Sequence, residues 1–150
     1  QCQASEENCR LITNADLICY PPGSFYSSLL ANFLPIGVSR AIYQNPNPKV
    51  YIPNLGNDPE THGLNTEESI ETLVRFLSHH LSNEKTSLLK SVKLLTHVLI
   101  DHHSQYYDGY IDDNKWEELG IKIVRRDLTS DAYAPYYDPK KLTQAILSLR

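Results

Sequence analysis

Short apolar runs alternate with segments of helical periodicity along this chain. Residues 15–20, 49–53, 96–100 and 121–124 are mostly apolar runs of strand length, and each is followed by a polar or proline-rich segment. Between and after these runs, apolar side chains recur at three- and four-residue spacing, which is typical of amphipathic helices. Strands that alternate with helices form a mostly parallel sheet covered by helices on both faces. The pattern therefore predicts a single α/β domain over residues 1–150.

Helix signals divide the first half of the chain further. Ser24 follows the first apolar run and can cap a helix, which Pro35 ends. A second short helix is expected around 38–42. The second run leads into 54–63, a loop rich in Asn, Asp, Gly and Pro.

The second half contains the clearest helix, which covers 65–81. It opens on Asn65 with Glu68 three residues later, which is the pattern of a capping box. Residues 82–91 are expected to form a linker that includes another short helix. Pro139 stands at the first position of the final helix, where its fixed φ angle and missing N–H are tolerated.

Ligands of parallel α/β sheets bind beyond the carboxyl ends of the strands, so the segments after the apolar runs are candidate sites. The segment 22–28 places a glycine and several hydroxyls where a strand gives way to a helix. Free N–H groups and the positive end of the helix dipole attract anions there, and a glycine permits close approach. This segment is a candidate phosphate site, and the alternative is that Ser24 only caps its helix and the other serines are only solvated.

The loop 54–63 is the second candidate. It offers amides, carboxylates and a hydroxyl that could hydrogen-bond a sugar, a base or a metal-bound phosphate. The alternative is a polar surface loop without a ligand.

Asp101, His102 and His103 follow the third run. One carboxylate and two imidazoles suit a divalent metal ion, and the tripeptide is similar to the signature of the DHH phosphoesterases. A two-metal site needs further Asp and His ligands, and no Asp-x-Asp follows an earlier strand. A polar strand end without a metal is therefore the favoured interpretation, and a DHH-type metal-dependent phosphoesterase is kept as a further alternative.

Composition and charge exclude several kinds of partner. The chain has 14 Lys and Arg against 18 Asp and Glu, a net charge of −4, which argues against binding nucleic acid. No apolar stretch is long enough to span a membrane, and the N-terminus lacks the apolar region of a signal peptide. Cys2, Cys9 and Cys19 match neither a zinc ribbon nor a redox pair, which favours a reducing, cytoplasmic location.

Six of the ten tyrosines lie in the last third of the chain, where their rings could stack on a nucleobase or cover a homodimer contact. They are Tyr106, Tyr107, Tyr110, Tyr133, Tyr136 and Tyr137. The chain contains no GxGxxG, Walker or nucleophile-elbow motif. It begins at Gln1 without an initiator Met, so we expect it to be a piece of a longer protein.

The first two candidate segments together resemble the C-terminal half of the CofD/YvcK superfamily, which comprises 2-phospho-L-lactate transferase and gluconeogenesis-factor-like proteins. The family has a strand ending in Gly-Pro-Gly-Ser-Leu-Tyr-Thr-Ser, and this chain has Pro-Pro-Gly-Ser-Phe-Tyr-Ser-Ser at 21–28. A later family loop, Asn-x-Met-Thr-Gln-Pro-Gly-Glu-Thr-Asp-Gly, resembles 54–63. The resemblance extends from about residue 16 to the final helix.

The chain departs from the family pattern at several positions. Pro21 replaces a glycine, the second loop lacks one glycine, and His62 stands where the family usually has Asp. Tyr136 and Tyr137 stand where the regulator branch tends to have Arg and His, so a phosphate-facing cation is missing. The family's N-terminal half, with its Gly-Gly-Gly-Thr-Gly turn, is not in this chain.

The resemblance implies a Rossmann-like fold that binds a phosphorylated or nucleotide-linked small molecule. An enzyme of this kind would be a transferase of the 2-phospho-L-lactate transferase type, with Mg2+ neutralising the diphosphate, and no catalytic residue is assigned. The alternative is a non-catalytic, nucleotide-sugar-binding regulator, which the Pro-Glu-Thr-x-Gly loop favours. The expected contacts are Gly23, Ser24 and Ser27, supported by Tyr26 and Ser28, and in the second loop Asn54, Glu60 and Thr61.

Overall fold

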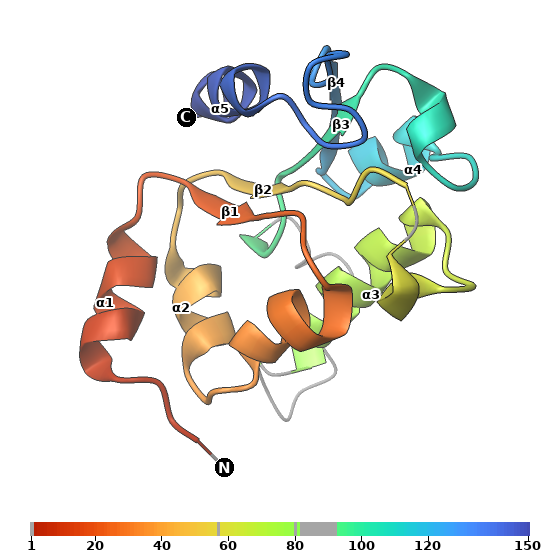
Figure 1. Ribbon diagram of the computed structural model, residues 1–150. Helices are drawn as coiled ribbons and strands as arrows, with labels where there is room; N and C mark the ends of the chain where they lie inside the picture. The colour runs from red at the N-terminus through yellow and green to blue at the C-terminus, as the bar shows by residue number, and fades with distance from the viewer. Residues whose placement is uncertain (1, 57, 80, 82–92) are drawn as a thin grey trace.

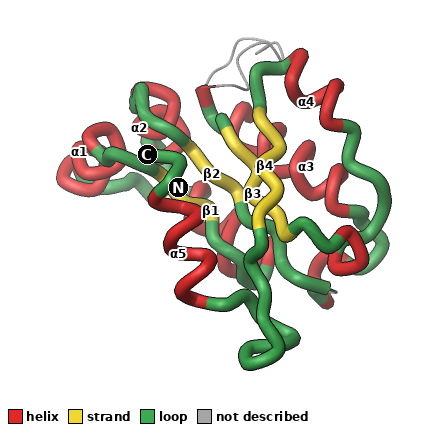
Figure 2. Tube along the Cα trace, turned by 90° about the horizontal axis from the view of Figure 1, so that it is seen from above, coloured by secondary structure: helices red, strands yellow, loops and turns green. Residues whose placement is uncertain are grey.

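Four parallel strands form one sheet in the order β1-β2-β3-β4. The structure is a computed structural model that describes residues 2–56, 58–79, 81 and 93–150. Figure 2 shows the strands side by side in chain order, with β1 at one edge and β4 at the other. The predicted parallel α/β sheet is confirmed. The strands are β1 (Ile18–Tyr20), β2 (Lys49–Tyr51), β3 (His97–Asp101) and β4 (Lys122–Arg126).

Helical segments connect the strands and cover both faces of the sheet. The strands follow one another across the sheet in chain order, so each crossover connection runs in the same direction. Right-handed crossovers that run in the same direction place their helices on the same face of the sheet. Figure 1 shows α2 and α3 on that face and α5 on the opposite one. The helical segments are α1 (Glu6–Asn14), η1 (Phe25–Leu29), η2 (Leu30–Phe33), α2 (Val38–Gln44), η3 (Pro59–Thr61), α3 (Thr66–His79), η5 (Ser104–Tyr106), α4 (Asp113–Glu118) and α5 (Pro139–Leu147).

The apolar core lies in two layers, one on each face of the sheet. Val98 packs with Leu73 of α3 and Trp116 of α4 in the larger layer. Leu99, the next residue along β3, packs with Ala145 of α5 in the smaller one. Successive strand residues point to opposite faces, so a strand covered on both sides reads as a continuous apolar run. This is why the runs, rather than an alternating pattern, identified the strands.

Two predicted helix starts are confirmed, and in both the capping side chain bonds to residues two or three positions away. Asn65 Oδ1 accepts a hydrogen bond from the Glu68 N–H, and Glu68 Oε2 accepts one from the Asn65 N–H, both at 2.8 Å. This capping box opens α3, and the Asp138 side chain caps α5. The expected linker and short helix at 82–91 lie outside the described residues.

One expectation about a helix was wrong, and one helix near the N-terminus was not predicted. Ser24 makes no side-chain capping bond, and the segment after it is a single π-helical turn followed by a 3-10 turn. The sequence also missed α1, which Ser5 caps through the Asn8 N–H, because α1 is mostly polar and none of its residues is fully buried. In the part of the chain that the structure describes, no helix is long and apolar enough to cross a bilayer.

Candidate ligand-binding site

The two loops that the sequence singled out meet at the carboxyl ends of β1 and β2. These strands are parallel neighbours, with Cys19 beside Val50, so the segments that follow them emerge at the same edge of the sheet. Asn54 joins the loops: its Oδ1 accepts from the Gly23 N–H at 2.8 Å, and its Nδ2 donates to the Gly23 carbonyl at 2.8 Å. Asn54 Nδ2 also donates to Asp58 Oδ2 at 3.1 Å, which closes the second loop on itself.

Carboxylates of the second loop occupy the amides that were expected to hold a phosphate. The Phe25 N–H donates to Asp58 Oδ2 at 2.9 Å. The N–H groups of Tyr26 and Ser27 both donate to Glu60 Oε2, at 2.7 and 2.9 Å, and the Ser27 hydroxyl donates to Glu60 Oε1. The expectation that these amides are free for a ligand was therefore wrong. Anions do lie at the start of η1, as expected for exposed N–H groups, but they are the chain's own carboxylates, Asp58 and Glu60.

The electrostatics of Glu60 follow from these contacts. The hydrogen bond from the Ser27 hydroxyl is the largest influence, followed by that from the Ser27 N–H, and together they hold the pKa of Glu60 below its ordinary value. Glu60 is therefore ionised at neutral pH. It links η1 to η3 as a fixed negative charge.

The remaining predicted residues divide into structural and exposed ones. Thr61 donates through its hydroxyl to the Asp58 carbonyl at 3.1 Å, which supports the turn of η3. Tyr26 lies 45% exposed with its ring edge-on to Phe25. Ser24 and Ser28 are exposed, and the Ser24 carbonyl accepts from the Ser28 N–H at 3.0 Å.

A cavity of about 500 Å³ opens at this edge of the sheet, on the side of α5. Three of the eight predicted contacts line it, namely Gly23, Ser24 and Asn54. The other five do not, although Thr61 borders a separate cavity of only about 40 Å³. We call the larger one the carboxyl-edge pocket. Among the described residues, its lining is Pro22, Gly23, Ser24, Asn54, Leu55, Asp58, Pro59, Pro135, Tyr136, Tyr137 and Leu142.

Tyr136 and Tyr137 form the wall of the pocket that comes from the segment before α5. Tyr136 is 74% exposed, so its ring is available to a ligand, whereas Tyr137 is 9% exposed. The Tyr137 hydroxyl donates to the Pro53 carbonyl at 2.6 Å and lies 3.0 Å from the Tyr107 hydroxyl. Burial raises the pKa of Tyr107 to about 12, so this hydroxyl stays protonated at neutral pH. The tyrosines were candidates for stacking on a base from the sequence, but the sequence did not indicate that two of them line this pocket.

A larger cavity of about 610 Å³ lies elsewhere, between α1, β1 and η2. Its lining is mostly apolar and includes Leu11, Ile18 and Phe33. An apolar lining does not offer the donors that a phosphate needs. The smaller carboxyl-edge pocket is therefore the better candidate for the expected ligand.

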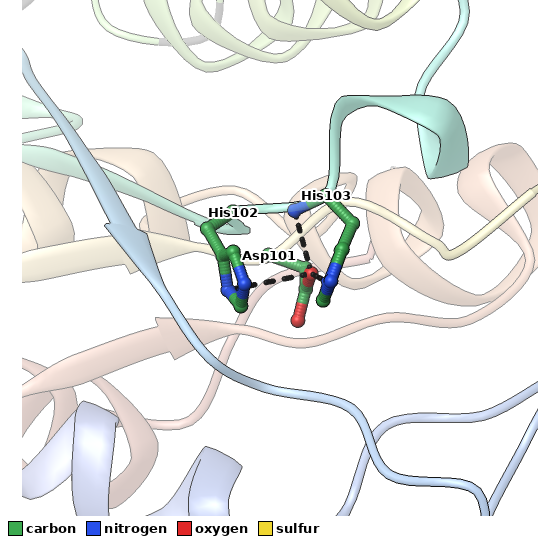
Figure 3. A group of neighbouring side chains, drawn as sticks. All are labelled: Asp101, His102 and His103. Carbon is green, nitrogen blue, oxygen red and sulfur yellow. Dashed lines mark hydrogen bonds and ion pairs between the residues drawn. The ribbon is translucent and has the colours of Figure 1, made fainter.

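Asp101, His102 and His103 lie together at the end of β3, as Figure 3 shows. Asp101 is 1% exposed, and its Oδ1 accepts from the His103 N–H and from His103 Nδ1, both at 2.8 Å. Its Oδ2 accepts from the Leu128 N–H at 2.7 Å. Burial alone would raise the pKa of Asp101, but the hydrogen bonds from His103 and Leu128 outweigh it and hold the pKa below its ordinary value. The carboxylate is thus an anion fixed at both oxygens.

This trio is the one group of three clustered metal-ligating side chains among the described residues. The two-metal site of a DHH-type phosphoesterase would need a second set of ligands, and that part of the chain supplies none. The tripeptide alone therefore does not support DHH chemistry.

Comparison with known proteins identifies the family. The family model for 2-phospho-L-lactate transferase CofD matches residues 1–129. A putative gluconeogenesis factor of Aquifex aeolicus is 27% identical over 150 residues, which cover 98% of this chain and 45% of that protein. A putative gluconeogenesis factor of Deinococcus radiodurans is 31% identical over 139 residues, which cover 92% of this chain and 29% of that protein.

A solved structure extends the likeness to the fold. A protein of the UPF0052 family from Bacillus halodurans superposes with a TM-score of 0.71 at 23% identity, covering 97% of this chain and 47% of that one. At this identity the likeness concerns the fold, and it agrees with the parallel sheet described above. The chain spans less than half the length of each of these relatives. Because the family model covers most of its residues, the chain belongs to the family of 2-phospho-L-lactate transferase CofD.

Proposed function

We propose that this chain binds a phosphorylated or nucleotide-linked small molecule in the carboxyl-edge pocket. The observation that carries the proposal is the meeting of Gly23, Ser24 and Asn54 in one cavity at the carboxyl ends of two adjacent parallel strands. This is the position at which parallel α/β sheets bind their ligands. Membership of the CofD family supports the same chemical class of ligand.

The arrangement of the pocket suggests how each part of such a ligand is held. The Ser24 hydroxyl is exposed at the rim and makes no capping bond, so it is available to a phosphate oxygen. The exposed ring of Tyr136 offers a flat face on which a nucleobase can stack. Asp58 and Glu60 stay bonded to the amides of η1, so the phosphate binds beside these carboxylates and does not replace them.

Of the two family branches, the non-catalytic regulator is the function that we propose first, ahead of the transferase. The residues described as lining the pocket include no His, Lys or Arg that could act as a general acid or neutralise a transferred phosphate. The relatives above are named as gluconeogenesis factors, which favours the regulator branch. The second candidate, a transferase, is favoured by the name of the family model.

Magnesium fits this pocket only as a companion of the ligand. Mg2+ prefers oxygen ligands in octahedral geometry. Asp58 accepts from the N–H groups of Phe25 and Glu60 and from Asn54 Nδ2, and Glu60 accepts three hydrogen bonds from η1. With these oxygens engaged, the described residues of the pocket offer no ready set of ligands for Mg2+, and the ion would arrive bound to a diphosphate.

Isothermal titration calorimetry with guanosine diphosphate, uridine diphosphate and a uridine diphosphate sugar tests the proposal, each with and without Mg2+. Ser24→Ala should weaken binding by about tenfold, because a hydrogen bond to a charged phosphate contributes roughly 1.5 kcal/mol or more. Ser28→Ala is the matched control, since Ser28 is an exposed serine of the same turn outside the pocket. Equal losses in both variants, or no binding of any of the three compounds, would contradict the proposal.

The same titrations separate the two family branches. A response to uridine diphosphate compounds alone supports the regulator. A response to guanosine diphosphate that depends on Mg2+ supports the transferase. These measurements use the chain as it stands and, where a longer protein is encoded, the longer protein as well.

A further inference from the structure

Asp101, His102 and His103 form a polar cluster that the proposed ligand pocket does not use. None of the three is among the residues that line the carboxyl-edge pocket. One potential ligand atom from each side chain lies within 4.8 Å of the other two. Figure 3 shows both imidazole rings turned toward the carboxylate of Asp101.

The distances within the cluster are close to those between the ligand atoms of a single ion. His103 Nδ1 lies 2.8 Å and His102 Nδ1 lies 3.9 Å from Asp101 Oδ1. Ligand atoms of a tetrahedral zinc ion are separated by about 3.4 Å, since the bonds to nitrogen and oxygen are each about 2.0–2.2 Å. The two observed separations lie on either side of this value. Small rotations of the rings would therefore bring all three atoms to one ion.

The cluster combines a fixed anion with two accessible rings. The Leu128 N–H holds Asp101 Oδ2 and the His103 N–H holds Oδ1, which faces both imidazoles. A carboxylate ligand that is itself hydrogen-bonded is the usual support of a metal site. The side chains of His102 and His103 are 48% and 49% exposed, so an ion can reach them from solvent and the rings can rotate.

We propose that Asp101, His102 and His103 bind one divalent transition-metal ion of the zinc class. Two imidazole nitrogens and one carboxylate oxygen suit Zn2+ and its neighbours, whereas Mg2+ requires oxygen ligands. Three protein ligands leave a coordination position open to solvent, which is the arrangement of reactive rather than structural zinc sites. To bind the ion through Nδ1, each imidazole carries its proton on Nε2, which frees the Nδ1 lone pair. The Nδ1 contacts of His103 with Asp101 Oδ1 and of His102 with the Arg126 carbonyl are then given up for the ion.

Titration with ZnCl2 alone tests this proposal, followed by calorimetry and by the visible spectrum of the Co2+ form. The wild-type chain should bind one Zn2+ per chain and show no comparable heat with MgCl2. His102→Gln and His103→Gln should each weaken zinc binding by at least about tenfold, as expected for loss of one ligand. His62→Gln is the matched control, because His62 is an exposed histidine outside the cluster, and it should leave zinc binding unchanged.

Several results would overturn the metal site. These are the absence of zinc binding at micromolar concentration, an affinity that neither His102→Gln nor His103→Gln changes, or a thiolate charge-transfer band in the Co2+ form. The last result would place the ion on a cysteine such as the exposed Cys2. Circular dichroism of each variant establishes that the fold is retained. The zinc titration contains no phosphorylated compound, so its result is independent of the result of the nucleotide titrations.

Discussion

The hydroxyls of Tyr107 and Tyr137 lie 3.0 Å apart and connect three segments at the carboxyl edge of the sheet. The Asp101 N–H donates to the Tyr107 hydroxyl at 2.6 Å, and the Tyr137 hydroxyl donates to the Pro53 carbonyl at 2.6 Å. Through these hydrogen bonds, Tyr137, in the segment that precedes α5, connects the end of β3 to the segment after β2. This connection fixes the position of the wall from which Tyr136 projects.

Removal of either hydroxyl should therefore destabilise the protein. Tyr107→Phe leaves the Asp101 N–H without its acceptor, and Tyr137→Phe leaves the buried Pro53 carbonyl without its donor. Each change should lower the free energy of unfolding by about 1–3 kcal/mol. Urea denaturation measures it, with Tyr110→Phe as the control, because Tyr110 is 80% exposed.

The double variant gives the sharper test of this pair. Tyr107 and Tyr137 share one hydrogen bond, so the double variant should lose less than the sum of the two single losses, by at least about 0.5 kcal/mol. Strictly additive losses would mean that the two hydroxyls act independently.

Glu60 should make stability depend on pH in the acid range. Hydrogen bonds from Ser27 lower the pKa of Glu60 in the folded chain below the ordinary value of 4.5. The stabilisation by this carboxylate is therefore complete above pH 4.5 and is lost as the pH falls through the folded pKa. Comparison of thermal midpoints for wild type and Glu60→Gln between neutral and acid pH measures the effect.

The two midpoints should differ at neutral pH and converge in acid. Glu118→Gln changes an exposed glutamate of α4 and should show no such convergence. A Glu60→Gln difference that stays constant with pH would contradict the assigned hydrogen bonds.

His97 should make stability depend on pH closer to neutrality, and here too stability should fall as the pH falls. Burial, with the nearby Lys122 charge as a smaller influence, lowers the pKa of His97 in the folded chain from 6.5. Below pH 6.5 the unfolded chain takes up a proton at this position that the folded chain resists, so stability falls until the pH passes the folded pKa. Chemical denaturation of wild type between pH 8 and pH 5 should show this decline, and His97→Gln should reduce it. An equally steep decline in His97→Gln would exclude His97 as its source, and His62→Gln serves as the control.

The sequence predicted those parts of the fold whose causes are local. Asn65 and Asp138 cap α3 and α5 through residues two or three positions away, and such contacts can be read from spacing. The parallel sheet followed from apolar runs that are covered on both faces. The missed helix α4 begins at Asp113 and is capped in the same way by Asp112, but it is short and buries only Trp116.

The candidate site was predictable only in its position. Parallel strands guarantee that 22–28 and 54–63 emerge at the same edge, so their meeting was foreseeable. The partner of each amide was not, because Glu60 and Ser27 lie 33 residues apart in the chain and their contact depends on the shape of the second loop, in which Asn54 bonds to Asp58. The wall that contains Tyr136 comes from a segment far along the chain, and the position of this segment relative to the sheet cannot be deduced from residue spacing.

The proposed binding of a phosphorylated or nucleotide-linked molecule in the carboxyl-edge pocket can be tested residue by residue. The most direct measurement is a ¹H–¹⁵N NMR titration of the chain with a uridine diphosphate sugar and with guanosine diphosphate. At least one of these compounds should shift the amide resonances of Gly23, Ser24 and Tyr136 and leave that of Leu11, in the apolar cavity beside α1, unchanged. Shifts concentrated around Leu11, or no shift with either compound, would show that the carboxyl-edge pocket does not bind these compounds.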